Sequence, residues 1–416
     1  MMGRGSKLLA TWLVACVVLT LVTTGVAQDA RTERPRFTTD SLPATPTGHT
    51  WQFSLQADHR SNSIDNAFAA TMLIGGAITP DAIALARDQM RFRGTLAARA
   101  SVQFATENTA TGRGWQIESG LVSDFRWTPE LFDLIFTGNS PHLGRFDVLN
   151  GTRGRAWQLN TVMRTGGWSN DLNEVRWGLG LAHRSMGAEG NISTGYFWVS
   201  SGVDTLYTSL YGRSAVLRAQ GLGLTGQIRF RRTDPSAKVA LTLEATHLGA
   251  LFVRPGDERI AVDTVLATTG LPLNGAGWSL ESLQGEGFAE SLIARDTLPG
   301  HLEALPATVS ASLTGSIIPG LAWEVRGTVG GWRPTPEAMA GLQFKVGSQS
   351  VAGIRAIYGG WGKFRPAIWA ELPIGPSHTL TLYAEDPAAA FRGTGLGRGF
   401  GLQLAKTLPT SAADKR

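Results

Sequence analysis

Charged side chains alternate with apolar ones in several segments of this 416-residue chain. Arg229 and Arg231 are separated by a single residue, and so are Glu324 and Arg326. In an extended strand, residues two apart share a face, so this spacing gathers charge on one side of each segment. Such a face either lines a water-filled interior and selects solutes, or pairs with opposite charges on neighbouring strands and fills that interior. The candidate pore-lining residues are Arg93, Arg99, Glu118, Arg229, Arg231, Glu244, Glu324 and Arg326.

Signatures of catalysis and cofactor binding are weak in this sequence. Gly221-x-Gly223-x-x-Gly226 has the spacing of a dinucleotide fingerprint, but that chemistry needs a helix after the glycines. Here Gln227–Arg231 continues as a strand, so we expect these glycines to ease packing within it. The chain has no Gly-x-Ser-x-Gly elbow, and its seven histidines show no metal-ligand spacing. We therefore predict a protein that is not an enzyme, with no catalytic residue, no cofactor and no metal.

His247 is the one histidine that keeps an enzymatic alternative open. It lies close in sequence to Glu244 and Thr246. A Ser, His and acid arrangement can also be assembled from separate strands, which residue spacing does not reveal. A membrane-embedded lipid-modifying enzyme is therefore the third of our functional hypotheses.

The alternating segments that carry these charges are long. Arg91 to Thr106 alternates apolar and polar residues over sixteen positions, while a soluble strand averages about five or six. Similar segments recur along the chain, and the clearest hairpin is Thr308–Gly331, with Pro319-Gly320 at its turn. A tilted strand needs about 9–11 residues to cross a bilayer, so these segments favour membrane strands over a soluble sandwich. Tryptophans near the segment ends are typical of membrane interfaces.

The N-terminus predicts export. Arg4 and Lys7 precede an apolar run from Leu8 to Val22, and small residues at Gly25 and Ala27 suit cleavage before Gln28. An anchored helix and a lipoprotein signal at Cys16 are the alternatives, but the run is short for a span and continues beyond Cys16. We expect a signal peptide at 1–27 and a polar periplasmic lead-in at 28–48.

Composition limits the class of protein further. Cys16 is the only cysteine, so the mature chain has no disulfide. The net charge is +5, and losing Arg4 and Lys7 with the signal makes it +3. A charge this small, spread along the chain, argues against nucleic acid as a partner. No later segment reaches 18 uninterrupted apolar residues, so we expect no membrane helix.

Three other segments interrupt the strand pattern. Thr79-Pro80-Asp81 and Thr128-Pro129-Glu130 are helix-start signals, so we expect two short helices that plug the lumen, cover a mouth or form periplasmic or surface caps. Residues 249–305 carry eight acids and three arginines with weak periodicity, which indicates a long external loop or mouth-covering insert. Residues 409–416 form a polar tail. The fold class we predict is all-β: an antiparallel transmembrane β-barrel over 49–408, with about 14 strands (roughly 12 to 16) and short inter-strand helices.

The order of these features resembles a known family. The chain is similar to a large family of uncharacterised outer-membrane barrel proteins from Bacteroidota, known as a domain of unknown function. The resemblance covers most of the mature chain, and it is carried by Leu131–Phe136 with Thr137-Gly138-Asn139, Trp177–Leu181, the insert after His247-Leu248-Gly249, and Leu382–Asp386 with Gly399–Leu402. It implies a barrel broadly similar to fatty-acid-transporter and porin-like folds, and it transfers no functional residue. The chain departs from many outer-membrane proteins in ending on a polar tail rather than on an aromatic, which puts the usual insertion signal in doubt.

Two main functional hypotheses follow for an outer-membrane protein. The first is a passive channel or transporter for small or amphipathic solutes. The second is a structural or assembly barrel that presents loops to a secretion or surface-protein partner. Outer-membrane lipid is the expected surrounding in both.

Overall fold

The computed structural model describes most of the chain between residues 48 and 409. Within that span it leaves out residues 75–76, 91, 109–110, 138–143, 145, 200–204, 218–219, 255–256, 270–292, 332, 334, 348–349, 361–363, 376 and 388–396. The expected signal peptide, nearly all of the expected lead-in and residues 410–416 lie outside the described residues. Among the described helices, none is long and apolar enough to cross a membrane.

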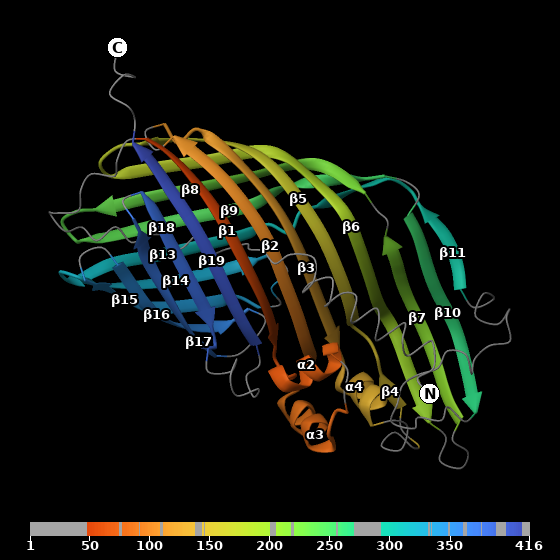
Figure 1. Ribbon diagram of the computed structural model, residues 1–416. Helices are drawn as coiled ribbons and strands as arrows, with labels where there is room; N and C mark the ends of the chain where they lie inside the picture. The colour runs from red at the N-terminus through yellow and green to blue at the C-terminus, as the bar shows by residue number, and fades with distance from the viewer. Residues whose placement is uncertain are drawn as a thin grey trace.

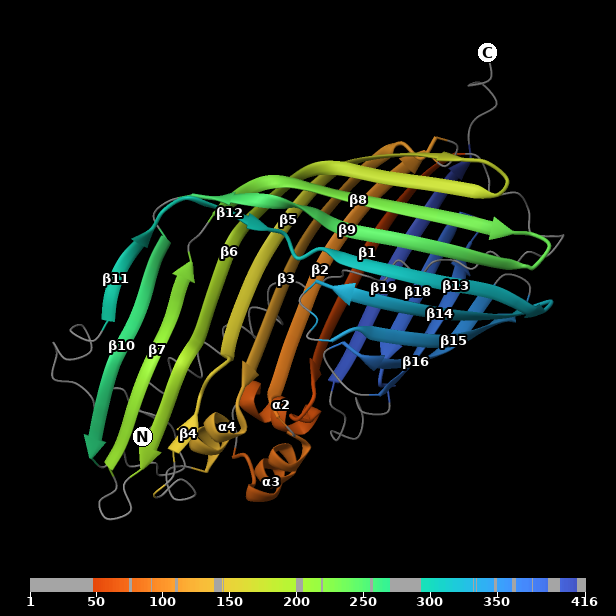
Figure 2. The same ribbon diagram turned by 180° about the vertical axis from the view of Figure 1, so that it is seen from behind.

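Fourteen of the described strands form a closed antiparallel barrel (Figures 1 and 2). In ring order they are β1 (Gly48–Ser61), β2 (Gly94–Asn108), β3 (Gly114–Trp127), β5 (Thr152–Ser169), β6 (Asn173–Val199), β8 (Gly221–Asp234), β9 (Val239–Val253), β13 (Thr308–Ile318), β14 (Leu321–Gly330), β15 (Glu337–Val346), β16 (Ser350–Gly359), β17 (Arg365–Ile374), β18 (His378–Glu385) and β19 (Gly397–Pro409). The ring closes because β1 pairs with β2 along one edge and with β19 along the other. The prediction of an antiparallel barrel of about 14 strands with short helices is confirmed.

The two ends of the barrel differ. At one end, short turns join β2 to β3, β8 to β9 and β13 to β14, and both Gly48 and Pro409 lie there. The predicted turn at Pro319-Gly320 is one of these, and Gly320 takes the positive φ of 84° that the turn requires. At the other end, longer connections carry the helices and the remaining strands. We call these the short-turn end and the long-connection end.

Alternate residues of each strand face opposite sides of the wall. On β18, Leu382 is 41% exposed whereas its neighbour Thr381 is 6% exposed. Leu382 pairs with Ala370 on one side and Leu402 on the other, so the outward face stays apolar from strand to strand. Thr381 pairs with Glu371 and Gln403, so the inward face stays polar. An apolar outside and a polar inside are the pattern of a membrane barrel.

Three short helices pack together at the long-connection end (Figure 1). They are α2 (Asn66–Ile74), α3 (Pro80–Gln89) and α4 (Pro129–Phe136). The two predicted helix starts are confirmed, because the hydroxyls of Thr79 and Thr128 accept hydrogen bonds from the backbone N–H groups of Ala82 and Leu131. Sequence reasoning missed α2, whose apolar residues show almost no helical periodicity.

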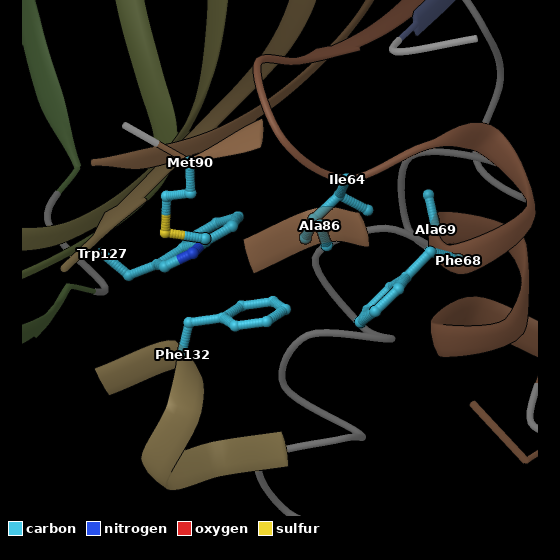
Figure 3. Packing of buried hydrophobic residues seen from close by; sticks show 7 residues of the cluster. All are labelled: Ile64, Phe68, Ala69, Ala86, Met90, Trp127 and Phe132. Atoms are coloured by element: carbon cyan, nitrogen blue, oxygen red, sulfur yellow. The ribbon is translucent and has the colours of Figure 1, made fainter. Parts of the chain in front are cut away.

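These helices lie against the outside of the wall. Their shared core contains Phe68, Phe132 and Trp127 (Figure 3). Leu96 and Phe125 pack against this core. The register of β2 and β3 places Leu96, Phe125 and Trp127 on the outward face, whereas the buried Asp124 lies on the inward face. Gly94 makes room for this core, since a Cβ there would overlap the indole of Trp127. We call α2, α3, α4 and this core the collar.

A second sheet leaves the barrel at β6. The first half of β6 pairs with β8, whereas Gly187–Val199 pairs with β7 (Thr205–Leu217). β7 pairs with β10 (Asp257–Thr269), and β10 pairs with β11 (Ile293–Leu298). We call these four segments the outer sheet, and Figures 1 and 2 show it beside the collar end of the barrel. Two short strands complete the set: β4 (Phe146–Val148) pairs with β6, and β12 (His301–Ala304) pairs with β9.

Several expected boundaries shift. The strand expected from Arg91 begins at Gly94, so Arg93 precedes β2. The insert expected over 249–305 begins inside the barrel wall, because β9 continues to Val253. The rest of that insert contains β10, β11 and β12, with residues 270–292 outside the described residues.

The outward position of Leu382 gives a stability prediction. Leu382→Arg places a charge against lipid, and we expect it to lower the free energy of unfolding by about 2–4 kcal/mol if the site lies near mid-membrane. Leu382→Ala is the matched control, because it removes the apolar side chain without adding charge. Urea unfolding of the protein folded into vesicles measures both. Equal unfolding midpoints for the two variants would contradict the lipid-facing assignment.

Candidate functional site

The inward face of the barrel is lined by polar and charged side chains. On β1, Ser54, Gln56, Asp58 and Arg60 are all buried and alternate with outward residues. Ser54 pairs with Gln403 of β19 and Gln103 of β2, and the same face continues through Glu118 of β3. The lumen is therefore the part of the molecule in which charged groups meet.

Seven of the eight charged candidates lie on inward register positions. They are Arg99 on β2, Glu118 on β3, Arg229 and Arg231 on β8, Glu244 on β9, and Glu324 and Arg326 on β14. Arg93 differs, because it is exposed and lies at the long-connection end before β2. Its guanidinium lies beside Gly151, where any side chain would collide with it.

The inward charges pair with partners that spacing along the chain does not reveal. Glu324 accepts hydrogen bonds from Arg355 at 2.5 and 3.3 Å. Arg326 lies 3.6 Å from Glu244 and donates a 3.0 Å hydrogen bond to Ser310. Glu324 and Arg326 thus contact different strands rather than each other, because two residues on one face of one strand point in parallel.

A buried ion network crosses the lumen at the long-connection end. Arg60 on β1 donates hydrogen bonds to Glu337 on β15 at 3.0 Å and to Glu385 on β18 at 2.9 Å. Arg365 on β17 bonds to the same two carboxylates. β1 and β15 are not neighbours in the ring, so the Arg60–Glu337 contact spans the interior. We call Asp58, Arg60, Arg99, Arg333, Glu337, Arg365 and Glu385 the mouth network.

Sequence reasoning missed most of the mouth network. Only Arg99 was a candidate, and it lies 3.5 Å from Asp58. The signal was present in β1, where Asp58 and Arg60 continue the polar alternation begun at Ser54. The strand β1 continues to Ser61, so both Asp58 and Arg60 lie within it. The other members lie at strand ends, where alternation alone identifies no partner.

An apolar cluster fills another part of the same lumen level. Ala97 on β2, Trp157 on β5, Ala182 on β6 and Leu251 on β9 are buried together with Leu305. Their register positions are inward, so this core lies inside the barrel and is separate from the collar. Its strands belong to one stretch of the ring, from β2 to β9.

Trp157 is held in this cluster by a charge. The guanidinium of Arg184 lies 4.7 Å from the centre of the Trp157 ring and only 1% of the Arg184 side chain is exposed. Arg184 also donates a 2.7 Å hydrogen bond to Glu303 on β12. The cation over the ring and the ion pair behind it fix the position of the indole.

Between the apolar cluster and the mouth network lies a cavity of about 60 Å³. Its apolar lining residues are Val122, Trp157, Leu159 and Pro306. Its polar lining residues are Arg99, Glu118, Thr161, Thr246, His247, Thr308 and Arg333. The volume is enough for a few water molecules, and the polar groups supply partners for them.

His247 reaches this cavity through a break in the regular strand. Its φ is +54°, and the β8–β9 register shifts between Gly226 and Ile228, which face it across the ladder. The extra residue of such a bulge redirects a side chain. The cavity lining contains threonines but no serine. In the part of the chain that the structure describes, no group of three His, Cys, Asp or Glu residues is placed to hold a metal.

Comparison with known proteins gives structural likeness only. No protein-family model and no curated protein matches the chain. The Pseudomonas putida toluene transporter TodX covers 92% of this chain and 93% of its own at 8% identity, with a TM-score of 0.40. The CymD monoaromatic hydrocarbon channel covers 87% and 89% at 8% identity, with a TM-score of 0.43. The translocator domain of autotransporter NalP from Neisseria meningitidis covers 91% and 95% at 9% identity, with a TM-score of 0.33. These TM-scores lie below 0.5, so no functional conclusion about this chain follows from them.

The mouth network gives a testable energetic coupling. Glu385→Gln removes the charge of one of the two carboxylates that Arg60 and Arg365 share, and we expect a loss of about 3–5 kcal/mol in the free energy of unfolding. Adding Arg365→Gln removes one of the guanidinium charges that lost this carboxylate partner, so the double variant should recover part of the lost stability. We expect a coupling free energy between the two substitutions of about 0.5–3 kcal/mol. Urea unfolding of the single and double variants measures it.

The control for this cycle is Asp88→Asn on the exposed surface of α3, which should change stability by less than about 0.5 kcal/mol. If the Glu385 and Arg365 effects simply add, the two side chains do not act as a pair.

Proposed function

We propose that this protein is a passive outer-membrane channel for small amphipathic solutes, with the lumen cavity as its selective constriction. The observation that carries the proposal is the position of that cavity. It lies between a buried ion network and a buried apolar cluster, and its lining combines both kinds of surface.

Among the residues that the structure describes, side chains of the barrel wall form the constriction. Arg60, Arg365 and their carboxylates occupy one side of the lumen, and Trp157 with its neighbours occupies the other. A solute that passes between them meets Trp157 on one side and Arg99 or Arg333 on the other. A small molecule with one apolar and one polar part satisfies both sides, whereas a large or wholly charged solute does not.

Below the constriction, the lumen is polar. Gln116 on β3 accepts a 3.1 Å hydrogen bond from Gln227 on β8, and Glu174 and Arg176 pair at 2.7 Å on β6. Side chains of this kind are solvated in water-filled barrels. Paired charges also keep the local field weak, which favours neutral or zwitterionic solutes over simple ions.

The outer membrane is the location that fits the apolar outer face and closed ring. In such barrels short turns face the periplasm and long connections face outward. By this rule Gly48 and Pro409 lie on the periplasmic side, which agrees with the expected signal peptide and periplasmic lead-in, and the collar lies outside the cell. Membership of the Bacteroidota family stays a prediction from the sequence resemblance.

Enlarging the constriction tests the channel. Trp157→Ala removes an indole that lines the cavity and narrows the lumen, so we expect larger single-channel conductance steps in planar bilayers and faster swelling of liposomes in small neutral solutes. Gln403→Ala is the matched control, because Gln403 lies on the inward face of β19 and does not line the cavity. Folded protein that gives no steps and no swelling, with or without Trp157, would show that the barrel is filled.

A second candidate, an assembly or secretion barrel, is favoured by the outer sheet. Its strands continue from the wall through β6 and stand beside the mouth, where they offer a surface to a surface protein. If this function holds, we expect a stoichiometric partner to co-purify with the full chain. It should be lost when β7 (Thr205–Leu217) and residues 257–298, which carry β10 and β11, are each replaced by a short linker that leaves the barrel strands β8 and β9 in place. Recovery of the barrel without any partner, together with conductance steps, would favour the channel instead.

A further inference from the structure

We propose that the collar is a lipid-binding element: Phe92 inserts among the acyl chains at the membrane interface, and Arg93 contacts a lipid phosphate. This surface is separate from the lumen, so it does not depend on the proposed transport function. The occupant we assign is an anionic, phosphate-bearing lipid surface.

The height of the collar supports this assignment. Trp115 and Trp127 lie near opposite ends of β3, and both face outward. At a rise of about 3.3 Å per residue and a tilt near 40°, they are roughly 30 Å apart along the barrel axis. That span matches the hydrocarbon thickness of a bilayer. If Trp115 marks the interface at the short-turn end, the collar around Trp127 lies at the opposite interface.

The collar is continuous with the lipid-facing surface. Its core packs on Leu96 and Phe125, which belong to the same outward faces as Phe104 and Ile117. Phe104 and Ile117 are 41% and 51% exposed, as expected for lipid-facing residues. A helical layer fixed to that face at interface height meets head groups and the upper acyl chains rather than bulk water.

Phe92 lies in an exposed position between α3 and β2. It is 87% exposed, the largest exposure among the described large apolar side chains. On one side of it, the Met90 N–H donates a 3.1 Å hydrogen bond to Arg87, which closes α3. On the other side, the side-chain amide of Asn62 donates to the Arg93 carbonyl at 2.7 Å and accepts from the Thr95 N–H at 2.8 Å. An aromatic residue held this way in water is unfavourable, and burial in lipid removes that cost.

Contacts among the collar helices and the wall hold the segment that carries Phe92 in place. Arg87 on α3 makes two hydrogen bonds of 2.8 and 2.9 Å to Asp133 on α4. Phe132 stacks on Trp127 at 6.5 Å between ring centres, which ties α4 to the wall. Leu85 on α3 is also 47% exposed and adds a second apolar contact. Aromatic and cationic residues together at an interface are the usual anchors of membrane-bound helices.

Site-directed labelling tests insertion. In a Cys16→Ser background, which has no other cysteine, Phe92→Cys carries an environment-sensitive fluorophore on the full chain reconstituted in vesicles. We expect blue-shifted emission that nitroxide-labelled lipids quench severalfold more than a label at Ser236→Cys in the exposed turn between β8 and β9. Ile354→Cys on the outward face of β16 is the lipid-buried reference. A label at 92 that behaves like the label at 236 would overturn the proposal.

The lipid phosphate is tested separately in the same protein. Vesicles of phosphatidylcholine alone are compared with vesicles that also contain phosphatidic acid. We expect the anionic lipid to increase quenching of the label at 92, and Arg93→Gln to abolish that increase while leaving the basal quenching. If phosphatidic acid has no effect, or if Arg93→Gln responds as the parent does, the phosphate contact is wrong. Single-channel conductance, measured in parallel, should be unchanged by Phe92→Cys and Arg93→Gln.

Discussion

Backbone hydrogen bonding is the constraint on which the rest of the structure depends. In hydrocarbon, an N–H or C=O group without a partner costs several kcal/mol, so a membrane sheet has to pair every edge. Here the pairing of β1 with both β2 and β19 removes the edges. Once the ring is closed, each strand has one face in the lumen and one outside, and the side-chain period of two decides where every residue goes.

This division explains why the charges meet in pairs inside. Arg60 has no route to solvent through the wall, so its charge is balanced by Glu337 and Glu385. The same need places Arg184 against Glu303 and over Trp157. Buried pairs of this kind add little net stability, but losing one partner is costly, because a single charge is then left in a poorly solvated place. Their effect on the lumen is steric: they occupy the space that an open pore leaves empty.

The sequence was informative about local structure and much less so about the lumen. Alternation in Thr308–Gly331 predicted a hairpin and its turn, because the signal is contained within neighbouring residues. The threonine caps at 79 and 128 predicted helix starts for the same reason. The mouth network was beyond such reasoning, since Arg60 and Glu337 are brought together only by ring closure. The helix α2 was missed because its apolar residues have no dominant face, and the collar's place outside the wall follows from tertiary packing on Leu96 and Phe125.

The length of β6 links the two sheets. Its backbone runs without a break from the lumen wall, where it carries Arg184, into the outer sheet, where it pairs with β7. No flexible linker lies within β6 between the barrel wall and the outer sheet, so one continuous strand attaches the outer sheet to the barrel. A force on the outer sheet is therefore transmitted along the backbone of β6, which also positions Arg184 in the lumen. Strand β6 couples the outer sheet mechanically to the constriction.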